Sequence, residues 1–278
     1  MNASFDVVIV GGGVTGAAVG YGLAKRGVKT CLVDAVPTFS RASRANMGLI
    51  WCQSKALGCP QFVRWGFASS RAYGNLAAEL KELSGIDTGY APTGGIIPCL
   101  GEAELEARAQ FIEKLRAETE DGTYPASVLS RKELEGMLPK VPFGPEVSGG
   151  IWSDMDGYVD PLHLMFAFRK SFVRLGGTLF AGERVSEVKP SGKGYAVVCG
   201  GRTLECGKAV LAAGLGVRKL AAQLGTDIPV FPNKSQVMRL ERIPADVLPI
   251  PLLGIARTFG GTVMIGAAHE NMGMDRRL

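Results

Sequence analysis

The stretch that decides the fold is residues 6–34, which read DVVIVGGGVTGAAVGYGLAKRGVKTCLVD. It opens with a short β-branched run that glycines end, and this pattern predicts a buried strand. An alanine-rich segment at residues 15–26 predicts a helix that closes near Gly27. Residues 29–33 predict a second strand that ends at Asp34. The stretch therefore predicts one βαβ unit with parallel strands and a right-handed crossover.

Three glycines at the strand–helix junction, Gly11, Gly13 and Gly16, form the pattern Gly-x-Gly-x-x-Gly. The first allows a tight turn, the second lets the backbone approach a pyrophosphate, and the third lets the helix pack close to the strand. The helix N-terminus supplies oriented N–H donors to the anion. Asp34 stands eighteen residues beyond Gly16, where a carboxylate accepts hydrogen bonds from an adenosine ribose. Together these features predict a dinucleotide site rather than a tight turn without a ligand.

The acid at Asp34 limits which dinucleotide the turn can bind. A carboxylate repels a 2′-phosphate, and this disfavours NADP. FAD and NAD both remain, because the glycine motif alone does not separate them.

The composition of the chain excludes several classes of protein. Its 278 residues are 46% hydrophobic and 21% charged, which excludes intrinsic disorder. The net charge of +5 comes without a run of Lys or Arg, so no nucleic-acid partner is predicted. No apolar run approaches the roughly 18 residues of a membrane span, and Asp6 interrupts any signal peptide, so a cytoplasmic location is predicted. The six cysteines match no zinc or iron–sulfur spacing, which predicts reduced thiols and no metal.

Further elements follow along the chain. Helices are predicted at residues 61–83, 102–118 and 160–175. The last of these begins with Asp160 as a carboxylate N-cap and Pro161 at the first helical position. Strands are predicted at residues 184–188, 195–199, 203–206, 209–212, 237–240, 253–256 and 262–265. A hairpin turn at residues 200–202 joins two of these strands.

The βαβ unit resembles the N-terminus of the D-amino-acid oxidase family of FAD-dependent oxidoreductases. Glycine oxidase, sarcosine oxidase and the dehydrogenase subunits for amino acids, opines and hydroxyproline belong to that family. Residues 41–49, RASRANMGL, stand where the family has a loop of small residues against the flavin. This chain departs from that run at Arg44, Asn46 and Met47. Further matches occur in order at residues 93–95, 157–161, 183–185 and 209–214.

The resemblance implies FAD rather than NAD as the cofactor. In the family, the valine that matches Val185 meets the adenine through its backbone, and the segment that matches Ala213-Gly214 lies beside the cofactor. The candidate cofactor-binding residues are Gly11, Gly13, Val14, Gly16, Asp34, Ala35, Ala42, Ser43, Asn46, Met47, Gly48, Leu49, Val185, Ala213 and Gly214. No catalytic residue, substrate ligand or metal ligand is predicted.

The resemblance also implies an α/β architecture of two domains. A Rossmann-like FAD-binding domain of the glutathione-reductase type is expected from residues 1–50 and 155–220. A mostly antiparallel α+β substrate domain is expected from residues 51–154 and 221–278. The ligand site is expected in a cleft between the two domains.

The implied reaction is oxidation of a C–N bond in an amino acid or secondary amine, by hydride transfer to the flavin. Because this chemistry needs no obligatory general base, neither His163 nor His269 is expected to be catalytic. Family members continue for about a hundred further residues, within ordinary domain sizes, and these carry a substrate arginine and the last flavin contacts. The alternative expectation is therefore a truncated, non-catalytic or partner-completed flavoprotein subunit, in which this chain alone binds FAD weakly or not at all and oxidises no amine. An NAD-dependent enzyme is a third, less favoured interpretation.

Overall fold

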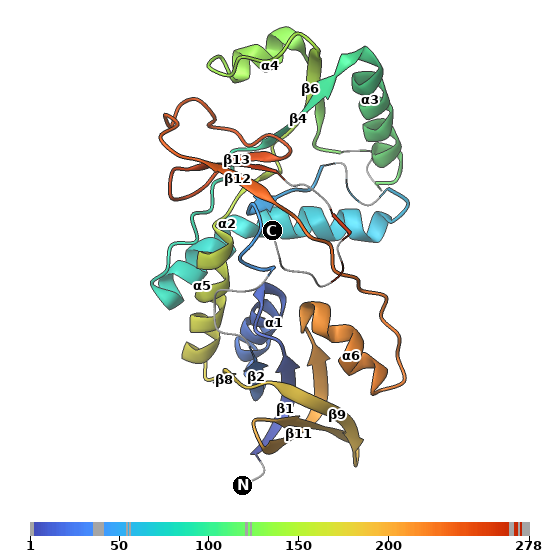
Figure 1. The fold of residues 1–278 in the computed structure, drawn as a ribbon, viewed down its shortest axis with the longest axis vertical. Coiled ribbons are helices and arrows are strands. Elements are labelled where there is room, and N and C mark those ends of the chain that lie inside the picture. The colour runs from blue at the N-terminus through green and yellow to red at the C-terminus, as the bar shows by residue number, and fades with distance from the viewer. Residues whose placement is uncertain are drawn as a thin grey trace.

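The computed structural model describes residues 3–35, 42–53, 55, 57–119, 122, 124–266, 270, 271 and 273. A six-stranded sheet lies at the N-terminal end of the molecule in Figure 1, and two antiparallel sheets lie toward the other end. The long helix α2 (Pro60–Ser84) runs between these two parts (Figure 1). This mixed α/β arrangement agrees with the predicted fold class.

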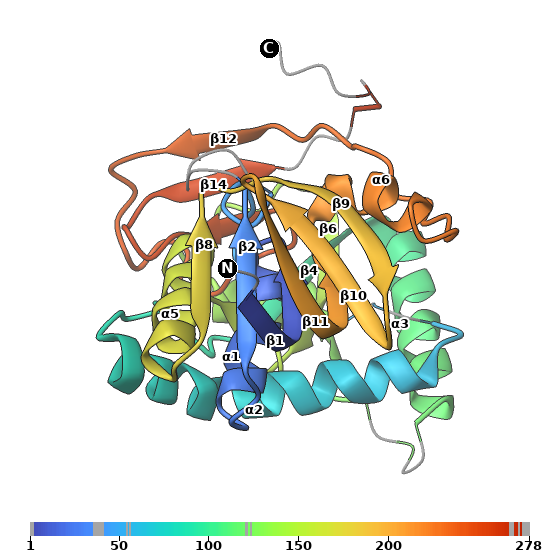
Figure 2. The same ribbon diagram turned by 90° about the horizontal axis from the view of Figure 1, so that it is seen from below.

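The six-stranded sheet is built on the βαβ unit. Its strands are β1 (Ala3–Val10), β2 (Thr30–Asp34), β8 (Thr178–Ala181), β9 (Val185–Ser191), β10 (Gly194–Cys199) and β11 (Arg202–Leu211). Their order is β8-β2-β1-β11-β10-β9, which Figure 2 shows from below. The pairs β8·β2, β2·β1 and β1·β11 are parallel, and the other two pairs are antiparallel. The parallel pairing of β1 and β2 confirms the prediction for residues 6–34.

Helices bury both faces of this sheet. On one face, α1 (Val14–Ala24) and α5 (Pro161–Arg174) pack on β1 and β2, with Phe172 of α5 fully buried. On the other face, α6 (Val217–Ala222) packs on a cluster that includes three buried cysteines. Burial raises the pKa of the Cys31 thiol to about 12, which keeps this thiol protonated and unreactive.

The antiparallel sheets form the second part of the molecule. One has the order β4-β6-β5, and the other has the order β12-β14-β13. Their strands are β4 (Gly95–Leu100), β5 (Ser127–Ser130), β6 (Val147–Ser153), β12 (Val237–Leu240), β13 (Ile255–Arg257) and β14 (Val263–Gly266). The backbone N–H of Ile96 donates to the carbonyl of Pro251 at 3.0 Å and joins the two sheets. Helices α3 (Gly101–Ala117) and α4 (Arg131–Met137) cover opposite faces.

The structure corrects some of the predicted elements. Residues 203–206 and 209–211 belong to one continuous strand, β11, because β1 pairs with residues on both sides of Gly207, while Ala212 lies just beyond the strand. The three strands β4, β5 and β6 were not predicted. Pro98 and Gly150, which pair directly with each other across β4 and β6, break the apolar pattern that identifies a strand. Backbone approach explains the glycine, since a Cβ there would lie 2.9 Å from the Ile97 carbonyl oxygen.

The predicted N-cap and hairpin turn are confirmed. The Asp160 carboxylate accepts hydrogen bonds from the N–H groups of Leu162 and His163 at the start of α5. Gly200 and Gly201 both have positive φ, at 53° and 75°, as a two-residue hairpin between β10 and β11 requires. None of the helices in the described part of the chain combines the length and apolar character that crossing a membrane demands.

Candidate functional site

The glycine turn follows β1 and packs against the ends of the two neighbouring parallel strands, β2 and β11. Gly11 has a φ of 108°, and its N–H donates to the carbonyl of Val33 at 2.8 Å. A Cβ on Gly11 would overlap the backbone of Ala212, and one on Gly16 would overlap the carbonyl of Gly11. Only glycine fits at these two positions, because the backbones of the turn, the helix and β11 meet there.

The N-terminus of α1 faces the predicted loop at residues 42–49. The Val14 N–H donates to the Ser43 hydroxyl at 3.0 Å. A Cβ on Gly13 would lie 2.8 Å from the same oxygen. The fold thus brings two predicted segments together at a helix N-terminus, where backbone N–H groups favour an anion.

Asp34 ends β2 beside the turn. Its side chain is only 6% exposed, and Oδ2 lies 3.2 Å from Nη1 of Arg169, which is 13% exposed. A Cβ on Gly12 would lie 2.9 Å from that carboxylate. Ala35 follows and is half-buried. Sequence reasoning missed Arg169, because an arginine inside a helix carries no motif that points to a distant acid.

The loop at residues 42–49 is stabilised by its own Asn46, one of the residues at which it departs from the family pattern. Asn46 donates from Nδ2 to the carbonyls of Ala42 and Ser43, at 3.2 and 3.0 Å, and its Oδ1 accepts from the Gly48 N–H at 2.9 Å. Gly48 has a φ of 71°, and a Cβ there would overlap the carbonyl of Val159. The Asn46 side chain therefore shapes the loop backbone, while Met47 is half-buried.

Strand β3 (Leu49–Ile50) leads out of the loop and pairs with β7 (Gly157–Tyr158). Leu49 lies directly opposite Tyr158 in this pair. The Tyr158 ring also bounds the space at Gly48, since a Cβ there would lie 3.0 Å from Cε2 of the ring. The loop is therefore anchored to residues just before α5.

Three further predicted residues flank strands of the six-stranded sheet. Ala213 follows β11, and its Cα would lie 2.8 Å from a Cβ on Gly11. Gly214, with a φ of 56°, begins the short 3₁₀ helix η1 (Gly214–Gly216). Val185 begins β9 and packs on the core cluster that contains Val33.

A buried carboxylate that was not predicted fixes the chain just after β3. Asp156 is 2% exposed. Its Oδ1 accepts from the N–H groups of Cys52 and Gln53, at 2.5 and 3.4 Å, and its Oδ2 accepts from Gln53 Nε2 at 2.6 Å. Gln53 Nε2 also donates to the Gly95 carbonyl at 2.9 Å. Burial raises the pKa of Asp156 to about 6, although these hydrogen bonds oppose the shift.

We call Gln53, Gly95 and Asp156 the carboxylate clamp. It links β3, β4 and the segment before β7, and its two side chains are separated by 103 positions in the sequence. Asp156 directly precedes residues 157–161, one of the segments that resemble the family. This position is the sole signal in the sequence that could have indicated a role for Asp156.

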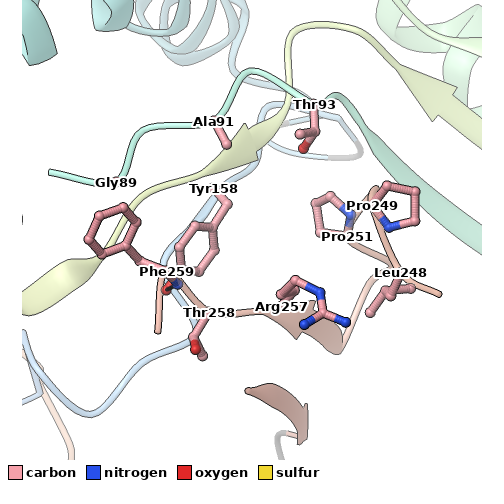
Figure 3. Close-up of a pocket in the computed structure, with 10 residues that line it drawn as sticks. All are labelled: Gly89, Ala91, Thr93, Tyr158, Leu248, Pro249, Pro251, Arg257, Thr258 and Phe259. Carbon is pink, nitrogen blue, oxygen red and sulfur yellow. Dashed lines mark hydrogen bonds between the residues drawn. The ribbon is translucent and has the colours of Figure 1, made fainter. Parts of the chain in front are cut away.

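A cavity of about 160 Å³ lies beside the loop anchor. Figure 3 shows Tyr158, Arg257 and Phe259 around it. The Tyr158 hydroxyl accepts from the Phe259 N–H at 3.3 Å, and burial raises the Tyr158 pKa to about 12. Arg257 donates to the carbonyls of Gly261 and Ile243, at 2.8 and 3.0 Å, so its guanidinium braces the backbone.

The two histidines were expected to be non-catalytic. His163 is half-buried at the start of α5, where its Nδ1 lies 3.0 Å from the Asp87 carbonyl and its ring meets Phe259 edge-on. His269 lies outside the described residues. Across the described ranges, no three His, Cys, Asp or Glu side chains gather where they could hold a metal ion.

These residues fit a dinucleotide such as FAD. The cradle at Gly11, Gly13 and Gly16 excludes side chains, as close approach to a pyrophosphate requires. Ser43 places a hydroxyl at the N-terminus of α1, and Asp34 places a carboxylate beside the turn. The donors and the acceptor that such a ligand needs therefore lie at one end of the parallel strands.

Comparisons with known proteins agree with this geometry. A family described as FAD dependent oxidoreductase matches residues 6–277. An opine oxidase subunit of Agrobacterium tumefaciens (strain Ach5) is 34% identical over 266 residues, which cover 95% of this chain and 71% of that protein. Glycine oxidase of Geobacillus kaustophilus (strain HTA426) is 28% identical over 283 residues, which cover 100% of this chain and 74% of that protein.

Solved structures give the same picture. The crystal structure of glycine oxidase from Geobacillus kaustophilus superimposes with a TM-score of 0.89 at 28% identity, covering 100% of this chain and 74% of that one. L-proline dehydrogenase from P. horikoshii shares the fold, with a TM-score of 0.82 at 20% identity over 99% of this chain and 73% of that one. The expected cofactor, FAD, and the expected enzyme class are thereby confirmed. The chain belongs to the D-amino-acid oxidase (DAO) family of FAD-dependent oxidoreductases.

Proposed function

We propose that the chain oxidises a C–N bond in an amino acid or secondary amine. The observation that carries the proposal is the meeting of the glycine turn, Ser43 and Asp34 at one end of the parallel strands. The names of the relatives support the substrate class, since they include a glycine oxidase and an opine oxidase. FAD supplies the hydride acceptor when it is bound.

The candidate residues would contact different parts of the cofactor. The turn at Gly11 to Gly16, with the N–H groups at the start of α1, would hold the pyrophosphate. Asp34 would accept hydrogen bonds from the adenosine ribose. The loop from Ala42 to Leu49 would lie against the flavin ring. Val185, Ala213, Gly214 and Ala35 would complete the surroundings of the cofactor.

The chain's own side chains bind and orient rather than act as a general base in this proposal. The Tyr158 phenol, whose pKa is about 12, is protonated near neutral pH and cannot accept a proton. The Asp156 carboxylate is committed to the backbone and side chain that follow β3. We therefore assign the carboxylate clamp the task of fixing the exit of the loop.

We also propose the division into residues 1–50 and 155–220, and residues 51–154 and 221–278. Its support is that the six-stranded sheet draws on strands at residues 3–34 and 178–211. The antiparallel sheets draw on residues 95–153 and 237–266. Hydrogen exchange tests this division, since amides within one domain should lose protection together and separately from those of the other.

A second candidate function is that of one component in a larger dehydrogenase or oxidase complex. The opine oxidase relative, at 34% identity, and the hydrogen cyanide synthase subunit HcnC of Pseudomonas aeruginosa, at 27%, are both named as subunits. Light scattering on material purified from its native host would separate this candidate from a self-sufficient enzyme. The predicted cytoplasmic location stays a prediction.

The experiment that tests the proposed activity is amine-dependent dye reduction. The purified chain with FAD is offered glycine, sarcosine, D-amino acids, hydroxyproline and opines, with oxygen or an artificial dye as acceptor. At least one of these amines should reduce the dye in step with formation of an oxo acid or aldehyde. The Gly16→Val variant serves as the cofactor-binding control. Failure with every amine, while FAD is bound, would overturn the proposal.

A further inference from the structure

We propose that Arg169 is a positioning residue for FAD, which holds the Asp34 carboxylate in place for the adenosine ribose. The inference rests on the proposed role of Asp34 in the cofactor site. It adds a residue 135 positions away in the sequence, on a helix that no glycine motif includes.

The geometry sets Arg169 apart from its neighbours on α5. Met165, Phe168 and Phe172 on the same helix are buried apolar side chains. Arg169 is nearly as enclosed, at 13% exposure, and Nη1 reaches Oδ2 of Asp34 at 3.2 Å. Placing a guanidinium among apolar side chains is costly unless a carboxylate pairs with it. The pair is therefore built into the packing of α5 against the end of β2.

The carboxylate is constrained from several sides at once. The Asp34 carbonyl accepts from the Gly182 N–H at 2.7 Å, which fixes its backbone next to β8. Gly12 leaves room for the side chain, since a Cβ there would lie 2.9 Å from Oδ2. Arg169 Nη1, 3.2 Å from Oδ2, restricts the rotation of the carboxylate about its Cβ–Cγ bond. A fixed acceptor loses less entropy when it binds two ribose hydroxyls.

The same ion pair could simply brace α5 on the sheet, and the ligand distinguishes the two roles. A brace affects the binding of every flavin alike, through the stability of the fold. A positioning residue for the ribose affects only ligands that carry adenosine. Because Arg169 acts through Asp34, its effect on FAD should also vanish once the carboxylate is absent.

The test is a titration of the flavin-free protein with FAD and with riboflavin, which lacks the adenosine diphosphate half, followed by flavin fluorescence. For Arg169→Met we expect the Kd for FAD to rise about tenfold, the effect of losing one charge-assisted hydrogen bond. The Kd for riboflavin should stay within about twofold, because no ribose contact is involved. Lys170→Met is the matched control, since Lys170 is the exposed basic neighbour on α5.

Two further variants keep the test sharp if Arg169→Met folds poorly. Arg169→Lys retains a cation and should bind FAD more tightly than Arg169→Met. In an Asp34→Asn background, adding Arg169→Met should leave the Kd for FAD unchanged. Equal losses for FAD and riboflavin, no loss for either, or an additive loss in the Asp34→Asn background would each overturn the proposal. The titration needs no substrate, so failed amine oxidation would count against the proposed function alone.

Discussion

Two buried carboxylates, Asp34 and Asp156, are held in different ways. Asp34 precedes the loop at residues 42–49 in the sequence, and Asp156 binds the chain just after β3, which follows that loop. Asp34 is 5% exposed and faces the guanidinium of Arg169. Asp156 is 2% exposed and is held by two backbone N–H groups and the amide of Gln53. Burial raises the Asp156 pKa to about 6. A carboxylate paired with an arginine suits ligand binding. The Asp156 carboxylate instead holds the backbone after β3, and the stability it provides depends on pH.

The largest effect on FAD binding and stability is expected at Gly16, in the glycine turn beside Asp34. Gly16→Val would push its side chain into the Gly11 carbonyl. We expect loss of FAD binding and a fall of about 3 kcal/mol in the free energy of unfolding, the upper range for overpacking. Urea unfolding and flavin fluorescence measure the two effects.

The matched control lies on the same helix. A Cβ on Gly22 would have only the end of the Arg26 side chain nearby, at 3.7 Å. Gly22→Ala should therefore keep FAD binding and stabilise the protein by about 0.5 kcal/mol. If Gly16→Val binds FAD as the wild type does, the glycine turn is not the cofactor site.

The next prediction concerns the pH response of the clamp. Because the pKa of Asp156 rises from 3.8 to about 6 on folding, the folded protein binds this proton more tightly than the unfolded chain. The stabilisation is complete below about pH 4 and is lost as the pH rises through about 6, a span of about 3 kcal/mol. Asp156→Asn should remove that part of the pH dependence.

Urea unfolding of both proteins between about pH 4 and pH 8 measures this difference. The gap in unfolding free energy between wild type and Asp156→Asn should change by about 3 kcal/mol across the range. Parallel curves would show that the carboxylate is not buried as described.

Removing the amide of the clamp should have a smaller effect. Gln53→Leu deprives Asp156 Oδ2 and the Gly95 carbonyl of their shared donor. Leaving buried acceptors without a partner lowers the free energy of unfolding by about 2 kcal/mol. Gln110→Leu is the control, because Gln110 is exposed on α3. Equal stability of the two variants in urea would remove Gln53 from the clamp.

The smallest effect is expected at the loop anchor. Tyr158→Phe removes the hydroxyl that accepts from Phe259 N–H and keeps the ring beside Gly48. The free energy of unfolding should fall by about 1 kcal/mol, with FAD binding retained. Thermal unfolding of the variant measures this loss. Tyr90→Phe is the control, since no hydrogen bond of the Tyr90 hydroxyl occurs among the described residues. A large loss of FAD affinity would instead place the hydroxyl in the cofactor site.

The same two regions mark how far the sequence could predict the site. The turn, α1 and Asp34 were predictable because their contacts lie within one short βαβ unit, where spacing encodes geometry. Arg169 and Gln53 were not, because each acts across more than a hundred positions through packing that no local pattern records. The predicted role of each cofactor-binding residue stays a prediction.

The fold shows the same division. Helices α2, α3 and α5 were predicted at nearly their observed bounds, because periodic apolar residues and an Asp-Pro start mark them. Strands β4 and β6 were not predicted, because Pro98 and Gly150 interrupt them. Their pairing depends on neighbours brought together by the fold, which a single stretch of sequence does not encode.

The proposed cofactor site requires that the unit from Gly11 to Asp34 holds the adenosine diphosphate half of FAD. Its most direct test is the ratio of Kd values for FAD and riboflavin in the wild type and in Asp34→Ala. We expect the wild type to bind FAD about tenfold or more tightly than riboflavin, and Asp34→Ala to lose about tenfold of this preference. Equal affinity of the wild type for the two ligands, or an unchanged preference in Asp34→Ala, would rule out this role of the unit.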